Sequence, residues 1–414
     1  MMRSIVASSL LALAAFGMRA EASDWPQWRG PTRDGVAPDS LPETLPSELR
    51  QLWRVEVGTG HASPIVVDGT VYVHSREGQA EVVRALDFDD GSELWRQSTE
   101  TRFTRNPGAL KHGKGPKSTP VAAGDSLCVF SINGRLTCLD RRSGTVAWQQ
   151  DFSERFGRTW PNFGTAMSPI IVGDRLIAHI GGVDAGALTA FDLETGRELW
   201  SREEDPPAYA SPVVVEIDGV EQVVTQTRQH LVAVSPDSGE LLWRTPFKTP
   251  HAQNSVTPLV VGSRVIVSGL DRGTTAYEPR RDTRGNWLLE AVWSSPEWSM
   301  HMSSPVALDG LLFGLADKRK GQLFCLDLET GEQRWSSEGR EGNNASLILS
   351  GGRLVVLTTE AELRIGSVDD KPWRPEATYT VAESEIWAHP ALLDGRLVTK
   401  DKTAVAVWSL APVD

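Results

Sequence analysis

Short apolar runs separated by turn residues recur along most of the chain. The runs at 65–67, 71–73 and 82–86 are rich in β-branched, aromatic and other apolar residues, and glycine-containing turns separate many such runs. Runs of this length and composition are typical of strands in an antiparallel meander. The pattern therefore predicts an all-β protein built from consecutive hairpins.

One phrase of fixed spacing ends most of these groups of runs. An apolar residue is followed by Asp or Ser, then by Gly four residues later and by Trp four residues after the Gly, at 86–95, 139–148, 191–200, 234–243 and 326–335. The Asp can form an Asx-turn and the Gly tolerates positive φ, so the phrase predicts a tight hairpin. The Trp then lies on the outermost strand, where its ring can pack on a neighbouring sheet while its N–H finds a carbonyl. We assign this docking role to Trp53, Trp95, Trp148, Trp200, Trp243, Trp293 and Trp335.

A second phrase, a small residue or His followed by Pro and an apolar run, begins each unit. It occurs at Ser63-Pro64, Thr119-Pro120, Ser168-Pro169, Ser211-Pro212, Thr257-Pro258, Ser304-Pro305 and His389-Pro390, with a degenerate copy near Ala345-Ser346. These eight starts lie 41 to 56 residues apart. A four-stranded sheet cannot bury both faces alone, and a radial arrangement packs each sheet on the next. We predict an eight-bladed β-propeller of four-stranded antiparallel blades over residues 50–414.

The last unit ends near Trp408, which leaves no room for its outer strand. A spare outer-strand phrase, Leu52 to Val55, stands at the other end of the chain. We expect this strand to complete the last blade and close the ring. On this interpretation residues 23–49 are an N-terminal arm: deletion of 50–57 should collapse the fold, whereas trimming 23–40 should not.

The phrase Ala-Phe-Asp-Leu-Glu-Thr-Gly-Arg-Glu-Leu-Trp at 190–200 resembles the tryptophan-docking repeat of the pyrroloquinoline-quinone-like propellers. The opening Asp24-Trp25-Pro26-Gln27-Trp28-Arg29-Gly30-Pro31, with Arg33-Asp34-Gly35, resembles the start of exported bacterial members. The superfamily contains quinoprotein alcohol dehydrogenases and also non-catalytic propellers, including the outer-membrane assembly lipoprotein. The resemblance extends over roughly residues 24–410 and implies the fold more strongly than a function.

The first 22 residues predict an export signal. A basic start is followed by an apolar run over 4–17 and by Ala20-Glu21-Ala22, which suits cleavage after Ala22. The run is shorter than the ~20 apolar residues that span a bilayer, and no later segment is apolar enough. The chain has net charge −12, and an acidic protein repels phosphate backbones, so nucleic acid is a poor partner.

The three cysteines are predicted to be free and buried. Asn133-Gly134 suggests a two-residue hairpin turn, which would place Cys128 and Cys138 on opposite faces of their sheet. Cys325 occupies a repeat position that elsewhere holds Ala. This interpretation predicts no disulfide.

The sequence lacks the chemistry that a quinoprotein needs. It has no adjacent Cys pair and no Cys-x-x-Cys-His haem site, and no residue matches the Ca²⁺ ligands or the catalytic Asp that the resemblance implies. Other catalytic signatures, such as Gly-x-Ser-x-Gly and His-Glu-x-x-His, are also absent. We assign no catalytic residue, no metal site and no cofactor.

The segments just before the inner strands are unusually rich in aromatic, His, Lys and Asn residues. In a propeller these connections gather around one mouth of the central channel, and loops on a rigid scaffold commonly carry binding residues. The alternative interpretation is that they are solvated loops. The candidate ligand-binding residues are His61, His112, Lys117, Trp160, Asn162, Tyr209, His251, Asn254, Trp298, His301, Asn343, Asn344, Trp387 and His389.

Two functions follow from these observations. The first is an exported binding or scaffolding propeller without catalytic activity, periplasmic or secreted and monomeric, whose mouth face binds an envelope or extracellular protein, a peptide or a glycan. The second is an oxidoreductase dependent on pyrroloquinoline quinone and Ca²⁺, acting on an alcohol or a sugar.

Overall fold

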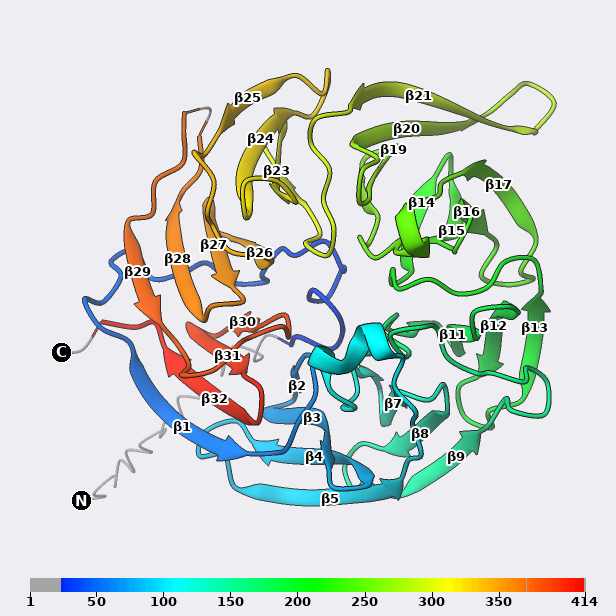
Figure 1. Cartoon of the computed structure of the whole chain (residues 1–414), viewed down its shortest axis with the longest axis horizontal. Helices are drawn as coiled ribbons and strands as arrows, with labels where there is room; N and C mark the ends of the chain where they lie inside the picture. The colour runs from blue at the N-terminus through cyan, green and yellow to red at the C-terminus, as the bar shows by residue number, and fades with distance from the viewer. Residues whose placement is uncertain (1–23, 370, 413–414) are drawn as a thin grey trace, which may run out of the picture.

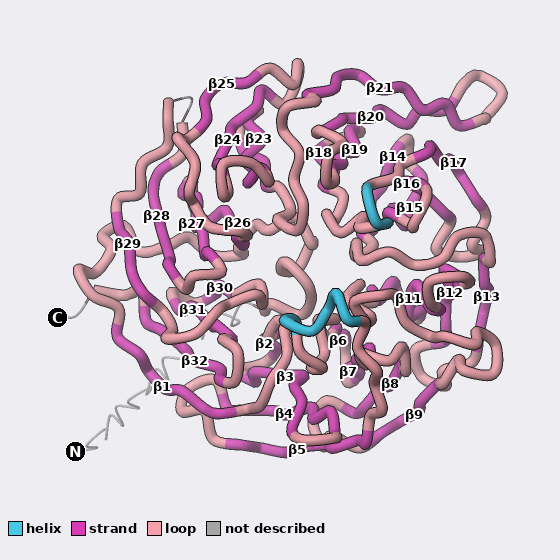
Figure 2. Tube along the Cα trace, viewed as in Figure 1, coloured by secondary structure: helices cyan, strands magenta, loops and turns pink. Residues whose placement is uncertain are grey.

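Eight four-stranded antiparallel sheets stand around a central axis in the computed structural model, which describes residues 24–369 and 371–412 (Figure 1). The predicted signal peptide lies outside the described residues. Almost all regular structure is strand, and the described residues contain two short 3-10 helices, η1 (Pro107–His112) and η2 (Pro250–Ala252) (Figure 2). The eight-bladed propeller predicted from the repeats is confirmed.

The blades follow one another in chain order. Blade one consists of β2 (Ile65–Val67), β3 (Thr70–Glu77), β4 (Ala80–Asp87) and β5 (Glu93–Glu100), and blade two of β6 (Val121–Ala123), β7 (Ser126–Phe130), β8 (Leu136–Asp140) and β9 (Val146–Gln150). Blade three consists of β10 (Ile170–Val172), β11 (Arg175–Gly181), β12 (Gly186–Asp192) and β13 (Glu198–Arg202), and blade four of β14 (Val213–Ile217), β15 (Val220–Gln226), β16 (His230–Val234) and β17 (Leu241–Pro246). Blade five consists of β18 (Leu259–Val261), β19 (Arg264–Ser268), β20 (Thr274–Arg281) and β21 (Trp287–Ser295). Blade six consists of β22 (Val306–Leu308), β23 (Leu311–Ala316), β24 (Gln322–Asp327) and β25 (Gln333–Ser336). Blade seven consists of β26 (Ala345–Ser350), β27 (Arg353–Thr358), β28 (Glu362–Ser367) and β29 (Ala377–Thr380).

The eighth blade combines the two ends of the chain, as predicted. It contains β30 (Ala391–Leu393), β31 (Arg396–Lys400) and β32 (Ala404–Ser409), and its outer strand is β1 (Arg50–Glu56). β1 pairs antiparallel with β32, with Val55 opposite Val405 and Trp53 opposite Val407. The ring is therefore closed by backbone hydrogen bonds between the N-terminal and C-terminal strands.

Tryptophans on the outer strands join each blade to the next. The Trp148 indole N–H donates to the carbonyl of Leu193 in the following blade at 2.9 Å, and its ring lies on Gly196. The same pair of contacts links Trp53 to Phe88 and Gly91, Trp95 to Arg141 and Gly144, Trp200 to Pro236 and Gly239, and Trp293 to Leu328 and Gly331. The Asp-to-Gly turn of each repeat thus supplies the carbonyl and the glycine that contact the tryptophan of the preceding blade.

Two of the seven assigned tryptophans dock differently. The β20–β21 hairpin continues past the position of the short turn, so Trp243 donates to the side chain of Gln222 in its own blade. Trp335 faces a blade without the Asp-to-Gly turn and belongs to an apolar cluster against which Trp373 packs. In that blade Tyr379 stands on the outer strand, and its hydroxyl donates to the carbonyl of Pro46.

The small residue before each Pro also connects neighbouring blades. The backbone N–H of Ser63 donates to the Thr119 hydroxyl at 3.2 Å, that of Thr119 to the Ser168 hydroxyl at 3.0 Å, and that of Ser168 to the Ser211 hydroxyl at 2.9 Å. Thr257 donates likewise to Ser304, and His389 donates to Ser63 across the ring closure. The second repeat phrase therefore links blades eight, one, two, three and four in one run of hydrogen bonds, and blades five and six by a further bond.

The prediction of three free thiols is wrong, because Cys128 and Cys138 form a disulfide across β7 and β8, which leaves Cys325 as a thiol outside that bond. The hairpin has a three-residue turn at 132–134 in which Gly134 has φ 82°, so Ser131 pairs with Arg135. The extra residue shifts the register by one and brings the two cysteines opposite each other, with Cα atoms 4.1 Å apart. A one-residue shift moves a side chain to the other face of a sheet.

Thiol titration tests this disulfide. The denatured mature protein should show one reactive thiol without reductant and three after reduction, because the disulfide holds two of the three cysteines. Three reactive thiols before reduction would restore the interpretation made from the sequence.

A pair of glycine substitutions tests the docking contact. Gly196 and Gly219 have φ of 70° and 68°, so Ala brings similar backbone strain to both. A Cβ at Gly196 would lie 2.5 Å from the Trp148 ring, whereas a Cβ at Gly219 meets nothing within 4 Å. Gly196→Ala should therefore lower the free energy of unfolding by about 1–3 kcal/mol more than Gly219→Ala in urea denaturation. Equal losses would mean that the contact with Trp148 contributes little.

Candidate functional site

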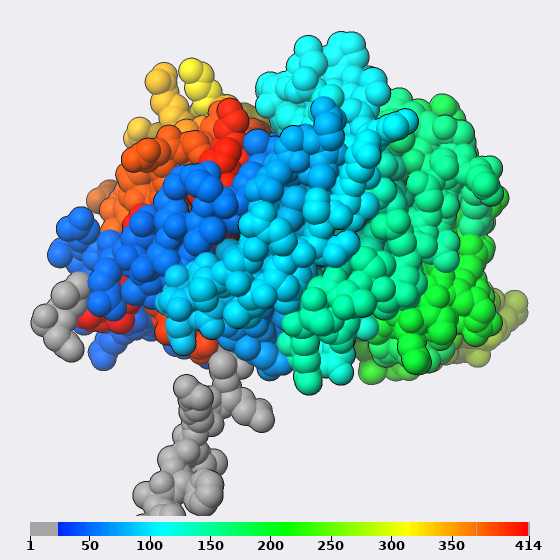
Figure 3. Space-filling view, turned by 90° about the horizontal axis from the view of Figure 1, so that it is seen from below, coloured from blue at the N-terminus to red at the C-terminus, as the bar shows by residue number. Residues whose placement is uncertain are grey.

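The channel has two unlike ends because the strands of each blade alternate in direction. The connections between blades precede the inner strands and lie at one end, which we call the mouth face. The short turns after the inner strands, such as Asp68-Gly69, lie at the other end, which we call the turn face. The connection 101–120, which contains η1, rises above the rest of the mouth face (Figure 3) and reaches over the middle of the ring (Figure 1).

Four of the predicted mouth residues and one unpredicted residue form a continuous aromatic row. The Trp387 ring lies 6.1 Å from that of His61 and 5.7 Å from that of His112, as measured between ring centroids. His112 also lies edge-on to Phe163 at 6.0 Å, and Phe163 lies edge-on to Tyr209 at 5.9 Å. This row spans connections before blades one to four and blade eight, which are far apart in the sequence.

Hydrogen bonds to backbone groups hold the aromatic row in place. A ring nitrogen of His61 lies 3.2 Å from the carbonyl oxygen of His112, and the Tyr209 hydroxyl accepts the backbone N–H of Phe163 at 3.3 Å. The Lys117 ammonium donates to the carbonyl of Phe163 at 2.5 Å. Burial raises the pKa of Tyr209 to about 12, so its hydroxyl stays neutral.

Two lysines, Lys117 and Lys400, lie close enough to His61 to affect its titration. Burial lowers the pKa of Lys117 to about 8, and burial together with the neighbouring Lys117 and Lys400 lowers the pKa of His61 to about 3. Lys400 is buried in β31 and donates to the carbonyls of Gly58, Gly60 and Asp401. At neutral pH this part of the mouth therefore contains the ammonium groups of Lys117 and the buried Lys400 beside a neutral imidazole.

Other predicted residues are committed to the scaffold. The amide of Asn254 is fully buried and bonds to Thr249, Thr227 and Phe247. The Trp298 ring packs on Phe324 at 4.8 Å and beneath the Lys318 ammonium at 3.5 Å.

The remaining predicted residues lie outside the aromatic row. Trp160 packs edge-on to Phe103, and Asn162 is half-buried near it in the chain. His301 is hydrogen-bonded to Gln253, and Asn344 accepts from Ser303. His251 and Asn343 are exposed.

His389 is buried, and it contacts the N-terminal arm, residues 23–49, which is predicted from the sequence to lie outside the propeller. Its imidazole stacks on Trp25 at 6.1 Å and meets the edge of Trp28 at 5.4 Å. These tryptophans belong to the N-terminal arm, which lies inside the channel (Figure 1). The arm and its arginines were missed as functional residues because their buried partners are separated from them by 135 to 276 residues.

No group of three or more His, Cys, Asp or Glu side chains in residues 24–369 and 371–412 is arranged to hold a metal ion. Nor is any described helix long and apolar enough to cross a membrane. Side chains of the arm, including Trp25, Arg29 and Arg33, are buried in the middle of the channel. The residues that the structure describes therefore do not fit a quinone held there beside a Ca²⁺ ion with carboxylate ligands.

The buried histidines make stability depend on pH. Burial lowers the pKa of His179 to about 4 and that of His389 to about 3, so both stay neutral in the folded state while the unfolded chain takes up protons below about pH 6.5. Their contribution is complete above pH 6.5 and is lost as the pH falls toward the folded pKa values. At pH 5 the stability that each of these two histidines contributes should be about 2 kcal/mol lower than above pH 6.5.

Urea denaturation at pH 7 and pH 5 measures this loss. His389→Asn should show a smaller difference between the two pH values than the wild type, whereas His251→Asn, at an exposed position, should show the wild-type difference. Equal stability of the wild type at both pH values would contradict the assignment of neutral buried histidines.

Comparison with known proteins identifies the family. The family model described as outer membrane protein assembly factor BamB matches residues 47–100, 79–337 and 290–371. The BamB proteins of Burkholderia pseudomallei and Yersinia pestis are 24% and 27% identical to this chain over 47% and 66% of its length. These alignments span 46% and 63% of the two relatives.

Two solved structures share the fold at 15% identity. BamB from Moraxella catarrhalis superposes with a TM-score of 0.62, covering 87% of this chain and 97% of that one. Quinohemoprotein alcohol dehydrogenase from Comamonas testosteroni superposes with a TM-score of 0.64, covering 95% of this chain and 82% of that one. Likeness at this identity shows the propeller and leaves the activity open. Because the family model matches most of its length, the chain belongs to the family described as outer membrane protein assembly factor BamB.

Proposed function

We propose that this chain is an exported, non-catalytic binding or scaffolding propeller that holds a protein partner through its mouth face. A peptide or a glycan is the alternative partner on the same face. The observation that carries the proposal is the aromatic row from Trp387 to Tyr209, backed by Lys117.

The chemistry of this row suits recognition of a protein surface. Tryptophan and tyrosine are among the side chains that supply most of the binding energy in protein interfaces, since aromatic rings bury large areas at low entropic cost. Three hydrogen bonds join the four connections that precede blades one to four, so little ordering of the row is needed when a partner binds. Relatives named as assembly factors support a scaffolding role over a catalytic one.

The predicted export signal supports a location in the periplasm or outside the cell, and the acidic net charge argues against nucleic acid. We propose that the chain acts as a monomer, because its ring is closed within one chain.

Photo-crosslinking in cell envelope extracts tests the face. A photoreactive amino acid at exposed Asn343 on the mouth face should yield one discrete adduct, and the same group at exposed Asp309 on the turn face of the preceding blade should not. Trp387→Ala should reduce the Asn343 adduct at least tenfold, since truncation of an interface anchor costs about 2 kcal/mol or more. Adducts of equal yield from both positions would contradict a specific mouth-face partner.

A cofactor titration distinguishes the second function, a quinone-dependent oxidoreductase, which is favoured only by the shared fold with the dehydrogenase. Pyrroloquinoline quinone with Ca²⁺ should leave the tryptophan fluorescence of the mature protein unquenched and give no dye-linked oxidation of alcohols or sugars. Saturable quenching together with dye reduction would establish the oxidoreductase instead.

A further inference from the structure

Two arginines of the N-terminal arm are almost completely buried in the channel. Arg29 and Arg33 are each 1% exposed, although a buried charge is costly unless its hydrogen bonds are satisfied. The Arg33 guanidinium donates to the carbonyls of Ser168, Pro169 and Pro212. Arg29 reaches Pro305 on another side of the channel.

These carbonyls form a ready acceptor site because of the repeat. They belong to the Ser-Pro phrases at the starts of β10, β14 and β22, which are the inner edge strands of their blades. An edge strand leaves backbone groups unpaired on its free side, and buried carbonyls need donors. A planar guanidinium with five N–H donors can satisfy several convergent carbonyls at once.

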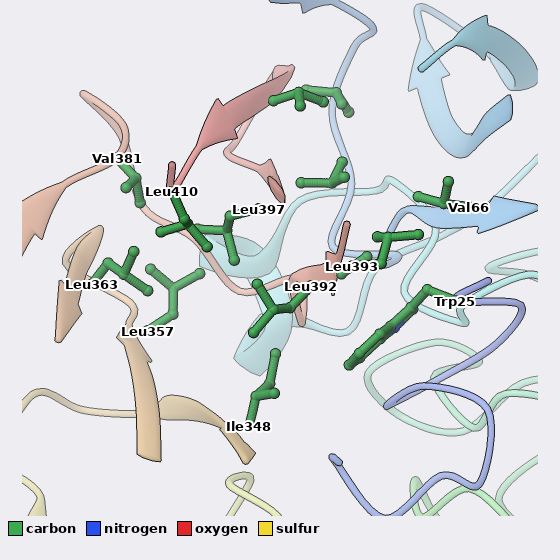
Figure 4. Packing of buried hydrophobic residues seen from close by; sticks show 14 of the residues in the cluster. Trp25, Val66, Ile348, Leu357, Leu363, Val381, Leu392, Leu393, Leu397 and Leu410 are labelled. Atoms are coloured by element: carbon green, nitrogen blue, oxygen red, sulfur yellow. The ribbon is translucent and has the colours of Figure 1, made fainter. Parts of the chain in front are cut away.

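The tryptophans of the arm anchor it to other blades. The backbone of Trp25 exchanges two hydrogen bonds with Val66 at 2.8 and 3.0 Å, and its side chain belongs to the same apolar cluster as Ile348 and Leu393 (Figure 4). The Trp28 indole donates to the Thr257 hydroxyl at 2.9 Å. The arm thus occupies the site through side chains and isolated bridges, as a bound peptide would, instead of forming a ladder strand.

The arm enters and leaves the channel at the turn face. Asp24 accepts from the backbone of Asp68 in one inner turn, and Asp39 accepts from that of Asp394 in another. The connection to β1 then crosses the surface, where Glu43 and Thr44 are exposed. Since both ends of the arm lie at one face, it can leave the channel without opening the ring.

We propose that the channel is a binding site for a turn-forming peptide bearing tryptophan and two arginines four positions apart, and that residues 24–36 are its resident occupant. A partner segment of the same chemistry binds only by displacing the arm, so the site is autoinhibited. The proposal is independent of the mouth-face partner, because the arm is reached from the turn face. It also replaces our expectation for the arm: trimming residues 23–40 should destabilise the fold.

A synthetic peptide of residues 24–36, labelled with a fluorophore, tests the site by fluorescence anisotropy. The full chain carrying Arg29→Ala and Arg33→Ala should bind it saturably and at least tenfold more tightly than the wild type, whose channel is filled. A peptide with both arginines replaced by Ala should bind the same variant at least tenfold more weakly.

The matched control removes two exposed arginines, Arg102→Ala and Arg284→Ala, and so makes the same change in net charge. It should bind the peptide as weakly as the wild type. Equal binding by the control and by the channel variant, or equal binding of both peptides, would overturn the proposal.

A second measurement covers the case in which the channel variant does not fold. A protease site inserted between Glu43 and Thr44 of the otherwise wild-type chain allows the arm to be cut after folding. The cut arm should stay bound through gel filtration and exchange with the labelled peptide of residues 24–36, but not with its Ala version. Loss of the arm without uptake of labelled peptide, or indifference to the arginines, would refute the site.

Discussion

The contact between neighbouring blades is the interaction on which this protein depends. A four-stranded blade has two apolar faces and buries neither alone, so each is stable only against its neighbours. Five tryptophans make that contact specific, since each indole donates to a carbonyl and lies on a glycine of the next blade. Trp53 makes the same contact across the closure, where β1 completes the eighth blade.

Closing the ring creates a second requirement at its axis. Eight inner strands turn their free edges toward one channel, and the carbonyls there need partners. Hydroxyls of the unit starts satisfy neighbouring N–H groups, while Arg29 and Arg33 satisfy carbonyls of three blades. The arm therefore supplies hydrogen-bond partners at the axis of the ring, as β1 supplies them at its outer edge.

The two ends of the channel have different chemistry. The mouth face gathers aromatic rings and two buried ammonium groups from connections before several blades. The turn face admits the arm and has short turns in place of long connections. A scaffold can thus hold a partner at one end while its own segment fills the other.

Local spacing determined much of the fold. The Asp, Gly and Trp positions gave the hairpins, the eight unit starts gave the number of blades, and the spare strand at 52–55 gave the closure. These features repeat with a short period, and their contacts involve adjacent blades, so a pattern in the chain reports them. The candidate row was found in part, because connections before inner strands must share one face.

Tertiary structure decided what local patterns do not encode. A turn one residue longer than expected moved Cys138 opposite Cys128, and the sequence Asn133-Gly134 fits both turns. Phe163 and Lys400 joined the mouth only through the meeting of distant blades. The place of Arg33 was decided by carbonyls more than a hundred residues away, which become acceptors only when the closed ring brings their free edges together.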